Sequence, residues 1–347
     1  MNNLYIINTN YHLYLTLLKV NYDLQTFGIR SDLILTDHLV NPLPQDMVRA
    51  LEQFNLFDHI YIMADSEITK KTGRGVKKLF TYRSKILEYV AKEFRNVGLN
   101  NIENTYDEIF VFLDYSAISH YFMIKKYSIN LIEDGMDIYY IYHESWRIYL
   151  NYLFGFPRKF GLSKYIKSIW ALHSDKLPES LKNKAKHYDI DEYKKKIDSK
   201  FIQKMINVYI PEHHNIIKEI NKKNKNKKIF LLLTQSYSEF GHMTENKKID
   251  IYRNIIKKYA NEDHLIVIKV HPKETTDYHK IFPNYIILPG AVPIEIISEL
   301  FAPIELCITI NSTAALNINC NERIMVKGEF NEDGWKKYMQ QLQVVGE

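Results

Sequence analysis

Three short apolar segments in the later part of the chain each end in a polar tip. Residues 229–234 run into Gln-Ser-Tyr-Ser-Glu, residues 264–270 into His-Pro-Lys-Glu, and residues 306–310 into Asn-Ser-Thr. Continuous runs of Ile, Leu and Val between helical patterns predict strands of a parallel sheet that is covered on both faces. Because such sheets bind ligands at the carboxyl ends of their strands, we expect the three tips to line one crevice.

The earlier part of the chain shows the same alternation of strand and helix patterns. Its apolar runs predict five strands, at residues 4–8, 32–36, 59–63, 107–113 and 129–132. Helical patterns lie between them, at residues 11–20, about 45–54, about 76–97, and 117–127. This rhythm predicts a doubly wound α/β sheet.

A charged run at residues 221–228 separates the two series and marks a domain boundary. Residues 139–221 before it are mostly helical and aromatic in pattern, with one plausible strand at 166–171. A final helix is expected from Asp333 to Val345, packing across the domain junction. The chain is therefore predicted to form two Rossmann-like domains that face a cleft, residues 1–222 and residues 223–347.

Composition excludes several classes of protein. At 347 residues and 46% apolar content, the chain is long enough for two folded domains. Its net charge of +5 is spread out, without the long basic face of a nucleic-acid binder. The two cysteines, Cys307 and Cys320, fit neither a disulfide framework nor a metal-ligand spacing.

The sequence shows no signal peptide and no apolar run near the ~20 residues of a membrane-spanning helix. We therefore expect a cytoplasmic protein. Its basicity leaves open a peripheral association with the inner face of the cell membrane. The sequence leaves the oligomeric state open as well.

The fifth predicted strand ends in Glu133-Asp134-Gly135. Side chains alternate along a strand, so one carboxylate can face a ligand while the other pairs locally. Gly135 permits a tight turn or the close approach of a ligand. The alternative is that these three residues only connect the strand to the following loop and have no functional role.

His271-Pro272 closes the second of the three C-terminal apolar runs. Proline fixes φ and lacks an N–H, so the strand ends there and the imidazole is held at the crevice. An imidazole can donate to a phosphate, or act as a general acid when an anion keeps it protonated. A polar surface histidine is the alternative interpretation.

Asn311-Ser312-Thr313 precedes small apolar residues that suit a helix. A Ser or Thr there predicts an N-cap, and the free N–H groups of a helix start also bind phosphate, so both interpretations stand. The remaining candidates also follow the predicted strands: Thr234 and Gln235, Glu239 as a second carboxylate base or a solvated acid, and Lys273 as a phosphate contact or simply an exposed polar residue. No metal-binding or serine-hydrolase motif is present, so no metal site is expected.

In this order, Glu133-Asp134-Gly135, His271-Pro272 and Ser312-Thr313 resemble the motif set of bacterial sialyltransferases. The chain looks most like the lipooligosaccharide sialyltransferases of glycosyltransferase family 52 and the related capsular polysialyltransferases. The resemblance covers the whole two-domain layout, while its specific part is confined to these short motifs. It implies a GT-B enzyme that uses CMP-sialic acid as its donor substrate, without a metal or other cofactor.

The resemblance also implies roles for the motif residues. Glu133 or Asp134 would deprotonate the acceptor hydroxyl. His271 would contact the CMP phosphate or act as general acid, and the Ser312-Thr313 pair would bind that phosphate. In the lipooligosaccharide enzymes the proposed base lies in the loop after the first strand of the second domain, which here holds Glu239; we favour the first motif.

These implications predict an inverting sialyltransferase that acts on a bacterial surface or capsular glycan, with terminal galactose as the expected acceptor. Aromatic residues from Tyr139 to Tyr152 are expected either to stack on the acceptor sugar or to pack in the core. The alternative enzyme is a GT-B transferase of another nucleotide sugar in capsule or lipopolysaccharide synthesis. An alternative of another class is a non-catalytic nucleotide- or sugar-binding module, in which the carboxylates and His271 would be dispensable.

Overall fold

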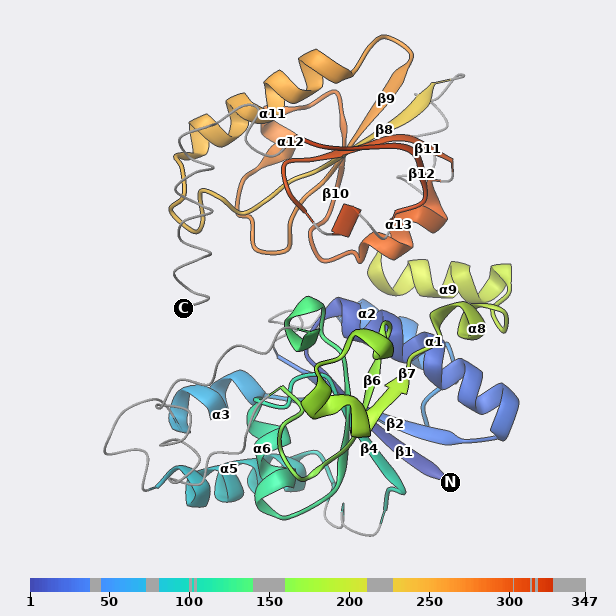
Figure 1. Cartoon of the computed structure of the whole chain (residues 1–347), viewed down its shortest axis with the longest axis vertical. Coiled ribbons are helices and arrows are strands. Elements are labelled where there is room, and N and C mark those ends of the chain that lie inside the picture. The colour runs from blue at the N-terminus through green and yellow to red at the C-terminus, as the bar shows by residue number, and fades with distance from the viewer. Residues whose placement is uncertain are drawn as a thin grey trace. The chain divides into compact units, whose positions relative to one another are not determined.

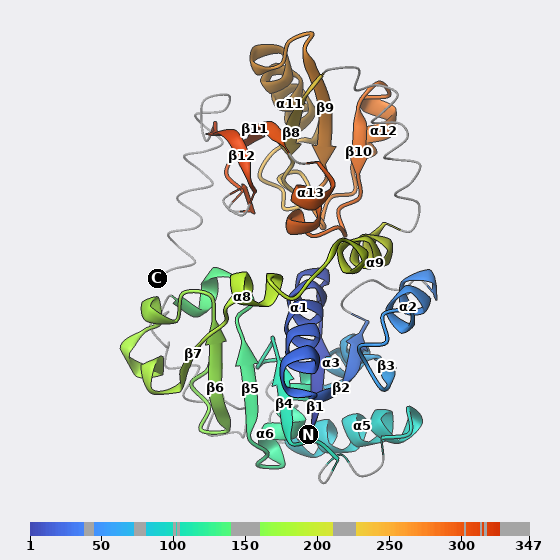
Figure 2. The same ribbon diagram turned by 90° about the vertical axis from the view of Figure 1, so that its right-hand side faces the viewer.

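The computed structural model divides the chain into two compact units, Met1–Lys204 and Met205–Glu347 (Figures 1 and 2). The structure describes residues 1–37, 45–72, 81–99, 102, 105–139, 160–210, 227–301, 303–312, 314–315 and 318–326. The predicted boundary at 222/223, the predicted helix at 333–345 and all but the first residue of the aromatic stretch at 139–152 lie outside these ranges, so they stay predictions.

The first unit contains one seven-stranded parallel sheet in the order β3-β2-β1-β4-β5-β6-β7. Its strands are β1 (Asn2–Ile7), β2 (Arg30–Thr36), β3 (Ile60–Met63), β4 (Glu108–Val111), β5 (Ile129–Ile132), β6 (Ile166–Ala171) and β7 (Ala185–His187). All six strands predicted for this unit are confirmed. The short edge strand β7 was not predicted, because its three residues carry no apolar run.

Helices cover both faces of this sheet. Consecutive side chains of its central strand β1 point to opposite faces, and since both sets are buried, both faces need helices packed on them. Leu4 and Ile6 pack on one side, in a core that includes Ile86 and Val90 of α5. Tyr5 points to the other side, toward α1. The helices are α1 (Asn10–Phe27), α2 (Gln45–Glu52), α3 (Asp65–Thr72), α5 (Tyr82–Asn96), α6 (Ala117–Ile124) and α8 (Ile190–Lys194), with 3-10 turns η2 (Met136–Tyr139), η3 (Ser174–Lys176) and η4 (Glu179–Lys184).

The second unit is built around a five-stranded parallel sheet in the order β10-β9-β8-β11-β12. The three predicted strands are its centre. Its strands are β8 (Lys228–Leu233), β9 (His264–Lys269), β10 (Ile286–Leu288), β11 (Ile304–Thr309) and β12 (Cys320–Met325). Its helices are α11 (Glu245–Tyr259), α12 (Tyr278–Ile281) and α13 (Ile294–Leu300), and α9 (Ser199–Tyr209) spans the division between the units.

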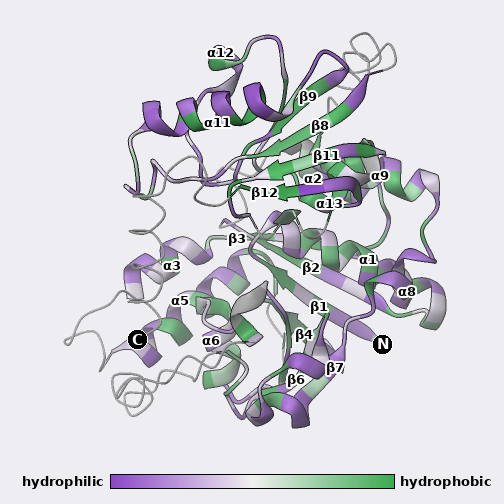
Figure 3. Cartoon of the chain, turned by 45° about the horizontal axis from the view of Figure 1, so that its top comes forward, coloured by the Kyte–Doolittle hydropathy of each residue, from purple (hydrophilic) through white to green (hydrophobic). Residues whose placement is uncertain are grey.

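The apolar character of the central strands explains their burial. Phe230 and Leu232 of β8 pack with Tyr252 and Ile255 of α11 in the core of this unit. Figure 3 shows hydrophobic colour along much of β8, β9 and β11, and hydrophilic colour on the outer turns of α11. The predicted α/β class with doubly wound parallel sheets is confirmed in both units.

In each sheet, the order in which the chain adds strands reverses at one point. In the first sheet the chain moves outward from β1 on one side and from β4 on the other; in the second sheet the corresponding strands are β8 and β11. In doubly wound sheets, ligands bind outside the carboxyl ends of the strands at such a switch point. A ligand site is therefore expected near the residues that follow these four strands.

Candidate functional site

The two acidic residues after β5 have different environments. Glu133 is buried, and it accepts hydrogen bonds from the Leu172 N–H at 2.7 Å and from the Tyr139 hydroxyl. Burial raises the pKa of Glu133, and these two hydrogen bonds oppose that rise. Glu133 thus ties the end of β5 to the segment after β6, which is a structural task.

Asp134 is the accessible member of the pair, with 36% of its side chain exposed. Its Oδ1 lies 2.7 Å from Nε2 of His12, a wholly buried side chain on α1. Nδ1 of His12 accepts the Asn8 N–H at 3.2 Å, so the ring proton of the neutral imidazole is on Nε2 and is donated to Asp134. The His12 ring is also stacked on Phe112 at 4.2 Å between centroids. One oxygen of Asp134 is therefore fixed, on a side chain that solvent still reaches.

Gly135 adopts φ +78, a left-handed conformation that favours glycine. The predicted tight turn after the acidic pair is confirmed. His12 was not predicted, although Asn8-Thr-Asn-Tyr-His12 follows an apolar strand in the same way as the three C-terminal tips. It lies near the switch point between β1 and β4, on the first turns of α1.

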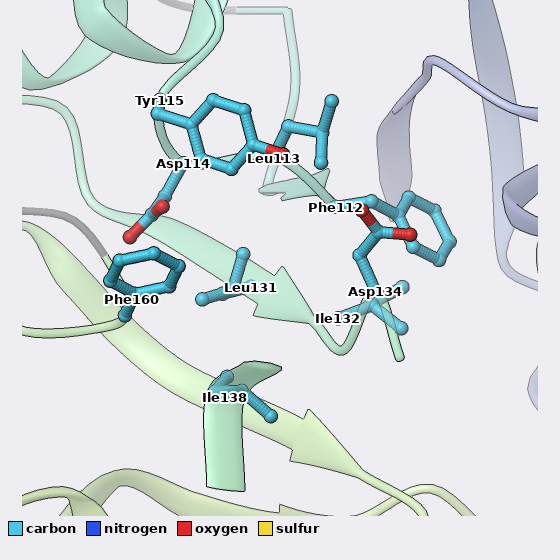
Figure 4. Close-up of a pocket in the computed structure, with 9 residues that line it drawn as sticks. All are labelled: Phe112, Leu113, Asp114, Tyr115, Leu131, Ile132, Asp134, Ile138 and Phe160. Atoms are coloured by element: carbon cyan, nitrogen blue, oxygen red, sulfur yellow. The ribbon is translucent and has the colours of Figure 1, made fainter. Parts of the chain in front are cut away.

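Asp134 lines a pocket at the carboxyl ends of β4 and β5, which Figure 4 shows in close-up. The other lining residues are mainly apolar or aromatic. They are Phe112, Leu113, Asp114, Tyr115, Leu131, Ile132, Ile138 and Phe160.

In the second unit, the backbone of His271 is held from several directions after β9. Its N–H lies 3.1 Å from Oγ1 of Thr234 and 2.9 Å from Oε2 of Glu274. A Cβ added to Gly290 would lie 2.8 Å from the His271 carbonyl oxygen and 3.0 Å from Cα of Pro272. The segment after β10 therefore packs so closely against the His271-Pro272 turn that only glycine fits at position 290.

The imidazole of His271 has one ring nitrogen engaged by the backbone. Nδ1 accepts the Lys273 N–H at 3.2 Å, which leaves the ring proton on Nε2. Burial and then the nearby cations Lys269 and Lys273 lower the pKa of His271 to about 4. The ring is therefore neutral at pH 7 in the unliganded protein and offers a single N–H donor; the general-acid role stays a prediction.

A buried lysine of α11 joins the loops that follow β8 and β9. Nζ of Lys248 lies 3.0 Å from both carboxylate oxygens of Glu239 and 3.0 Å from Oε1 of Glu274. Neither Lys248 nor Glu274 exposes its side chain. Glu274 also accepts hydrogen bonds from the Tyr278 hydroxyl at 2.7 Å and from the Thr234 hydroxyl. We call Thr234, Glu239, Lys248, Glu274 and Tyr278 the Lys248 cluster.

The Lys248 cluster changes the interpretation of Glu239. Burial acts to raise the pKa of this carboxyl, but hydrogen bonds from backbone N–H groups, with Thr275 at 3.0 Å, and from Lys248 lower it to about 2. A carboxylate that is stabilised in this way is a weak proton acceptor. The geometry favours Asp134 over Glu239 as a general base.

The remaining predicted residues lie at the same edge of the second sheet. Oδ1 of Asn311 accepts the Tyr237 hydroxyl, which joins the segments after β8 and β11 across the switch point. The Ser312 N–H donates to Oγ1 of Thr309 at 3.1 Å, and the Gln235 N–H donates to the Tyr252 hydroxyl at 2.6 Å.

The helix expected after this motif is not found in the described residues. Ala314 and Ala315 form a 3-10 turn, and Thr313 lies outside the described part of the chain. Of the expected phosphate site, Asn311 and Ser312 lie in the described part of the chain, and the site as a whole stays a prediction. The Lys273 side chain is exposed, with Nζ 5.5 Å from the centre of the Phe240 ring.

The structure thus joins Thr234, His271 and Glu274 by direct contacts, and it links Glu239 to them through Lys248. Asn311 contacts Tyr237 of the loop after β8. These contacts support the prediction of one crevice for the three C-terminal tips. Lys248 was not predicted, because a lysine inside an amphipathic helix pattern gives no sign of its buried partners. The cleft expected between the two domains stays a prediction.

Within the described ranges, no group of three or more His, Cys, Asp or Glu side chains is arranged to hold a metal ion. No helix there combines the length and hydropathy needed to cross a membrane. Metal independence and cellular location stay predictions.

Comparison with known sequences gives two matches. A sequence model of glycosyltransferase family 52 matches residues 57–329, a range that includes all three motifs. An uncharacterized protein of Haemophilus influenzae is 35% identical over 199 residues, which are 56% of this chain. The chain covers 60% of that relative's length.

Solved structures share the fold at low sequence identity. An α/β-galactoside α-2,3-sialyltransferase from Photobacterium phosphoreum has a TM-score of 0.55 and 14% identity, with 99% of this chain and 96% of that chain covered. A sialyltransferase from Photobacterium damsela has a TM-score of 0.53 and 14% identity, with 93% and 74% covered. A UDP-GlcNAc 2-epimerase from Methanocaldococcus jannaschii has a TM-score of 0.50 and 14% identity, with 98% and 92% covered. At this identity the likeness shows the fold alone.

Proposed function

The chain belongs to glycosyltransferase family 52, and from this premise we propose that it transfers sialic acid from CMP-sialic acid to a hydroxyl of a glycan acceptor. The observation that carries the proposal is the contrast between its carboxylates. Asp134 is exposed and oriented by His12, whereas Glu133 and Glu239 are engaged in structural contacts.

Family membership confirms the predicted glycosyltransferase, and the resemblance to bacterial sialyltransferases is confirmed at the level of fold. The GT-B fold class is confirmed in the same way, since its two parallel-sheet domains match those enzymes. Because an epimerase shares this fold, the fold alone does not determine which reaction the chain catalyses. The choice of sialyl transfer rests on the motifs.

In the proposed reaction, the acceptor hydroxyl oxygen attacks the anomeric carbon of the sialic acid. The bond between that carbon and the phosphate oxygen breaks, and CMP leaves with the bonding electron pair. The hydroxyl proton passes to Asp134. One displacement of this kind inverts the anomeric configuration.

Asp134 suits the role of base for a physical reason. A carboxylate must reach the hydroxyl by a hydrogen bond and must have a free lone pair when the proton moves. The His12 Nε2–H occupies one oxygen at 2.7 Å and orients the group, and the exposed part of the side chain remains available to substrate.

The residues around His271 suit the departing phosphate. We propose that the Nε2–H of His271 and the Ser312 hydroxyl donate to it. Hydrogen bonds hold the backbone N–H groups of both residues, and preorganised donors stabilise developing negative charge. The Lys273 side chain adds a cation nearby. Phosphate binding would also oppose the low pKa of His271, because an anion favours the protonated ring. These residues provide the required charge without a metal ion, so we propose a metal-independent reaction.

We propose that the acceptor is a bacterial surface or capsular glycan. We also propose that the protein associates peripherally with the inner face of the cell membrane. The competing proposal, transfer of another sugar in capsule or lipopolysaccharide synthesis, differs in the nucleotide of the donor. A UDP- or GDP-sugar would then replace CMP-sialic acid.

The test is transfer from CMP-sialic acid to a labelled lactoside in the presence of EDTA. Wild type is compared with Asp134→Asn and His271→Ala, and with Glu179→Gln as a control at an exposed carboxylate of η4. We expect sialylated product from wild type and the control, and at least a hundredfold lower rate in the two site variants, in line with the ~10²–10⁴-fold contribution of a positioned acid or base. Consumption of a UDP- or GDP-sugar in place of CMP-sialic acid would overturn the proposal.

A further inference from the structure

An exposed aromatic ring follows β8 in the second unit. Phe240 exposes 57% of its surface, although its neighbour Glu239 is held in the Lys248 cluster. Backbone hydrogen bonds fix this turn: the Phe240 N–H donates to the Ser236 carbonyl oxygen at 3.2 Å, and the N–H groups of the next two residues donate to preceding carbonyl oxygens at 3.0 and 2.9 Å. The His242 ring lies 6.1 Å from the Phe240 ring between centroids. An ordered turn thus presents a large apolar ring to solvent.

A lysine from the loop after β9 lies over this ring. Nζ of Lys273 is 5.5 Å from the centre of the Phe240 ring, a distance at which a cation is attracted to an aromatic face. The backbone of Lys273 is fixed as well, since its N–H donates to Nδ1 of His271 at 3.2 Å. The loops after β8 and β9 therefore present an aromatic ring and an ammonium group together, next to the histidine proposed for the departing phosphate.

The charge of this lysine is left unpaired by the described part of the chain. No carboxylate there forms an ion pair with Lys273. The two acids of the Lys248 cluster are already engaged: Glu239 contacts Lys248 and the Thr275 N–H, and the Glu274 side chain is wholly buried. An exposed cation without a partner at a ligand site attracts an anion.

The pair of side chains restricts which anion fits. Lys273 offers one compact positive charge, and Phe240 offers an apolar face that a bare phosphate cannot use. In CMP-sialic acid, the sialyl carboxylate is on the same carbon as the phosphate oxygen, and C–H groups lie along the rest of the sugar ring. The cytosine base is separated from the phosphate by the ribose. The sialyl group is therefore the part of the donor that combines a carboxylate near the phosphate with apolar surface.

We propose that Lys273 and Phe240 form the subsite for the sialyl group of the donor, where the ammonium pairs with its carboxylate and the ring packs on its C–H groups. The inference rests on the proposed function and assigns the residues that select an acidic sugar. A neutral hexose has no carboxylate for Lys273, so this subsite favours CMP-sialic acid over a UDP- or GDP-hexose.

Calorimetric titration separates the sialyl group from the nucleotide. The ligands are CMP and a ring-fluorinated CMP-sialic acid, whose electron-withdrawing fluorine slows the loss of CMP. We expect Lys273→Met to weaken binding of this analogue about five- to twentyfold, and Phe240→Ala about three- to tenfold. Lys273→Arg keeps the positive charge and should stay within about threefold of wild type. CMP lacks the sialyl group and should bind wild type and the three variants within about twofold of one another.

Two exposed residues away from the subsite provide matched controls. Lys280 is exposed on α12 of the same unit, and Phe27 is a 64% exposed ring at the end of α1. Lys280→Met and Phe27→Ala should bind the analogue as wild type does. Because Lys273 and Phe240 are exposed too, all the variants should keep their fold.

A methyl ester of the analogue identifies the group that Lys273 contacts. The ester removes the charge of the sialyl carboxylate and leaves the phosphate unchanged. Wild type should bind the ester about five- to twentyfold more weakly than the acid. Lys273→Met should bind the acid and the ester alike, which is the coupling expected of two groups in direct contact.

The outcomes separate this inference from the proposed function. Equal weakening of CMP and the analogue in Lys273→Met, or the same difference between acid and ester in both proteins, would place Lys273 on another part of the donor. Either result would overturn the inference and leave the proposed donor standing, as would unchanged binding of the analogue to Phe240→Ala. Failure of wild type to bind both CMP and the analogue would instead refute the proposed donor, and the inference with it.

Discussion

Removal of the buried cation of the Lys248 cluster should destabilise the second unit strongly. In Lys248→Met, the side chain keeps a similar length but loses its charge, so two carboxylates at 3.0 Å from Nζ lose their partner. The Glu274 side chain is wholly buried, whereas 14% of the Glu239 side chain is exposed, so most of the cost should come from Glu274. Removal of one partner from a buried ion pair costs about 3–5 kcal/mol. That is a large fraction of the 5–15 kcal/mol that typically stabilises a domain.

Hydrogen exchange measured by mass spectrometry is the assay, because it reports the two units separately. Slow amides of β8, β9 and β11 should exchange roughly two to four orders of magnitude faster in Lys248→Met, at ~1.4 kcal/mol for each tenfold change. Amides of β1 and β4 provide the internal reference. Lys247→Met is the matched control, since Lys247 is the exposed neighbour on the same helix.

The pH dependence and one double variant complete the test. The folded pKa of Glu239 is about 2, below its unfolded value of about 4.3. Its stabilising contribution is therefore full above about pH 4.3 and is lost as pH falls toward 2, so the gap between wild type and Lys248→Met should narrow in acid. Glu239→Gln added to Lys248→Met should recover part of the loss. A change below about 1 kcal/mol in Lys248→Met at pH 7 would refute the reasoning.

Three further changes test individual contacts. Gly290→Ala should lower kcat/KM at least tenfold through the donor KM, because the new Cβ meets the His271 carbonyl at 2.8 Å; normal kinetics would contradict this close packing. His12→Phe keeps a ring beside Phe112 but removes the donor to Asp134 and the acceptor of the buried Asn8 N–H, so both kcat and thermal stability should fall; an unchanged kcat would contradict the role of His12 in orienting Asp134. Burial lowers the pKa of Lys269 to about 7, below its unfolded value of about 10.4, so this group makes stability rise between those pH values. Urea denaturation at pH 7 and pH 9.5 should show a smaller rise in Lys269→Met than in wild type, and an equal rise would contradict the assignment.

The central strands could be predicted from the sequence because burial on both faces requires continuous apolar runs. The runs at 229–234, 264–270 and 129–132 are such cases, and each is a strand in the structure. The edge strands β7 and β12 could not be predicted, since one side of an edge strand lacks a neighbour and its residues are largely polar. The edge strand β3 was still predicted from its apolar run, whereas the edge strand β10 was missed although its three residues are apolar, because so short a run does not stand out in the sequence.

The candidate site was predicted in part for a similar reason. Alternation along a strand was enough to expect that one of Glu133 and Asp134 would be engaged locally and the other accessible. Their partners could not be predicted, because His12 lies 122 residues from Asp134 along the chain and Lys248 meets Glu274 only when α11 packs on the sheet. Sequence patterns identify the acids, and tertiary packing decides which of them can accept a proton.

The hydrogen bond from Asn8 to His12 also limits where the reaction proton can go. Nδ1 of His12 is occupied as an acceptor at 3.2 Å, and Nε2 already carries the hydrogen directed at Asp134. In this arrangement the imidazole has no free nitrogen to accept a proton, unlike the histidine of a serine protease triad, which takes the proton of the serine. In the proposed reaction, a proton taken up by Asp134 would leave through the exposed side of the carboxylate, into water or a buffer base. Solvent would then reset the proposed base, and the buried histidine would keep the same tautomer throughout.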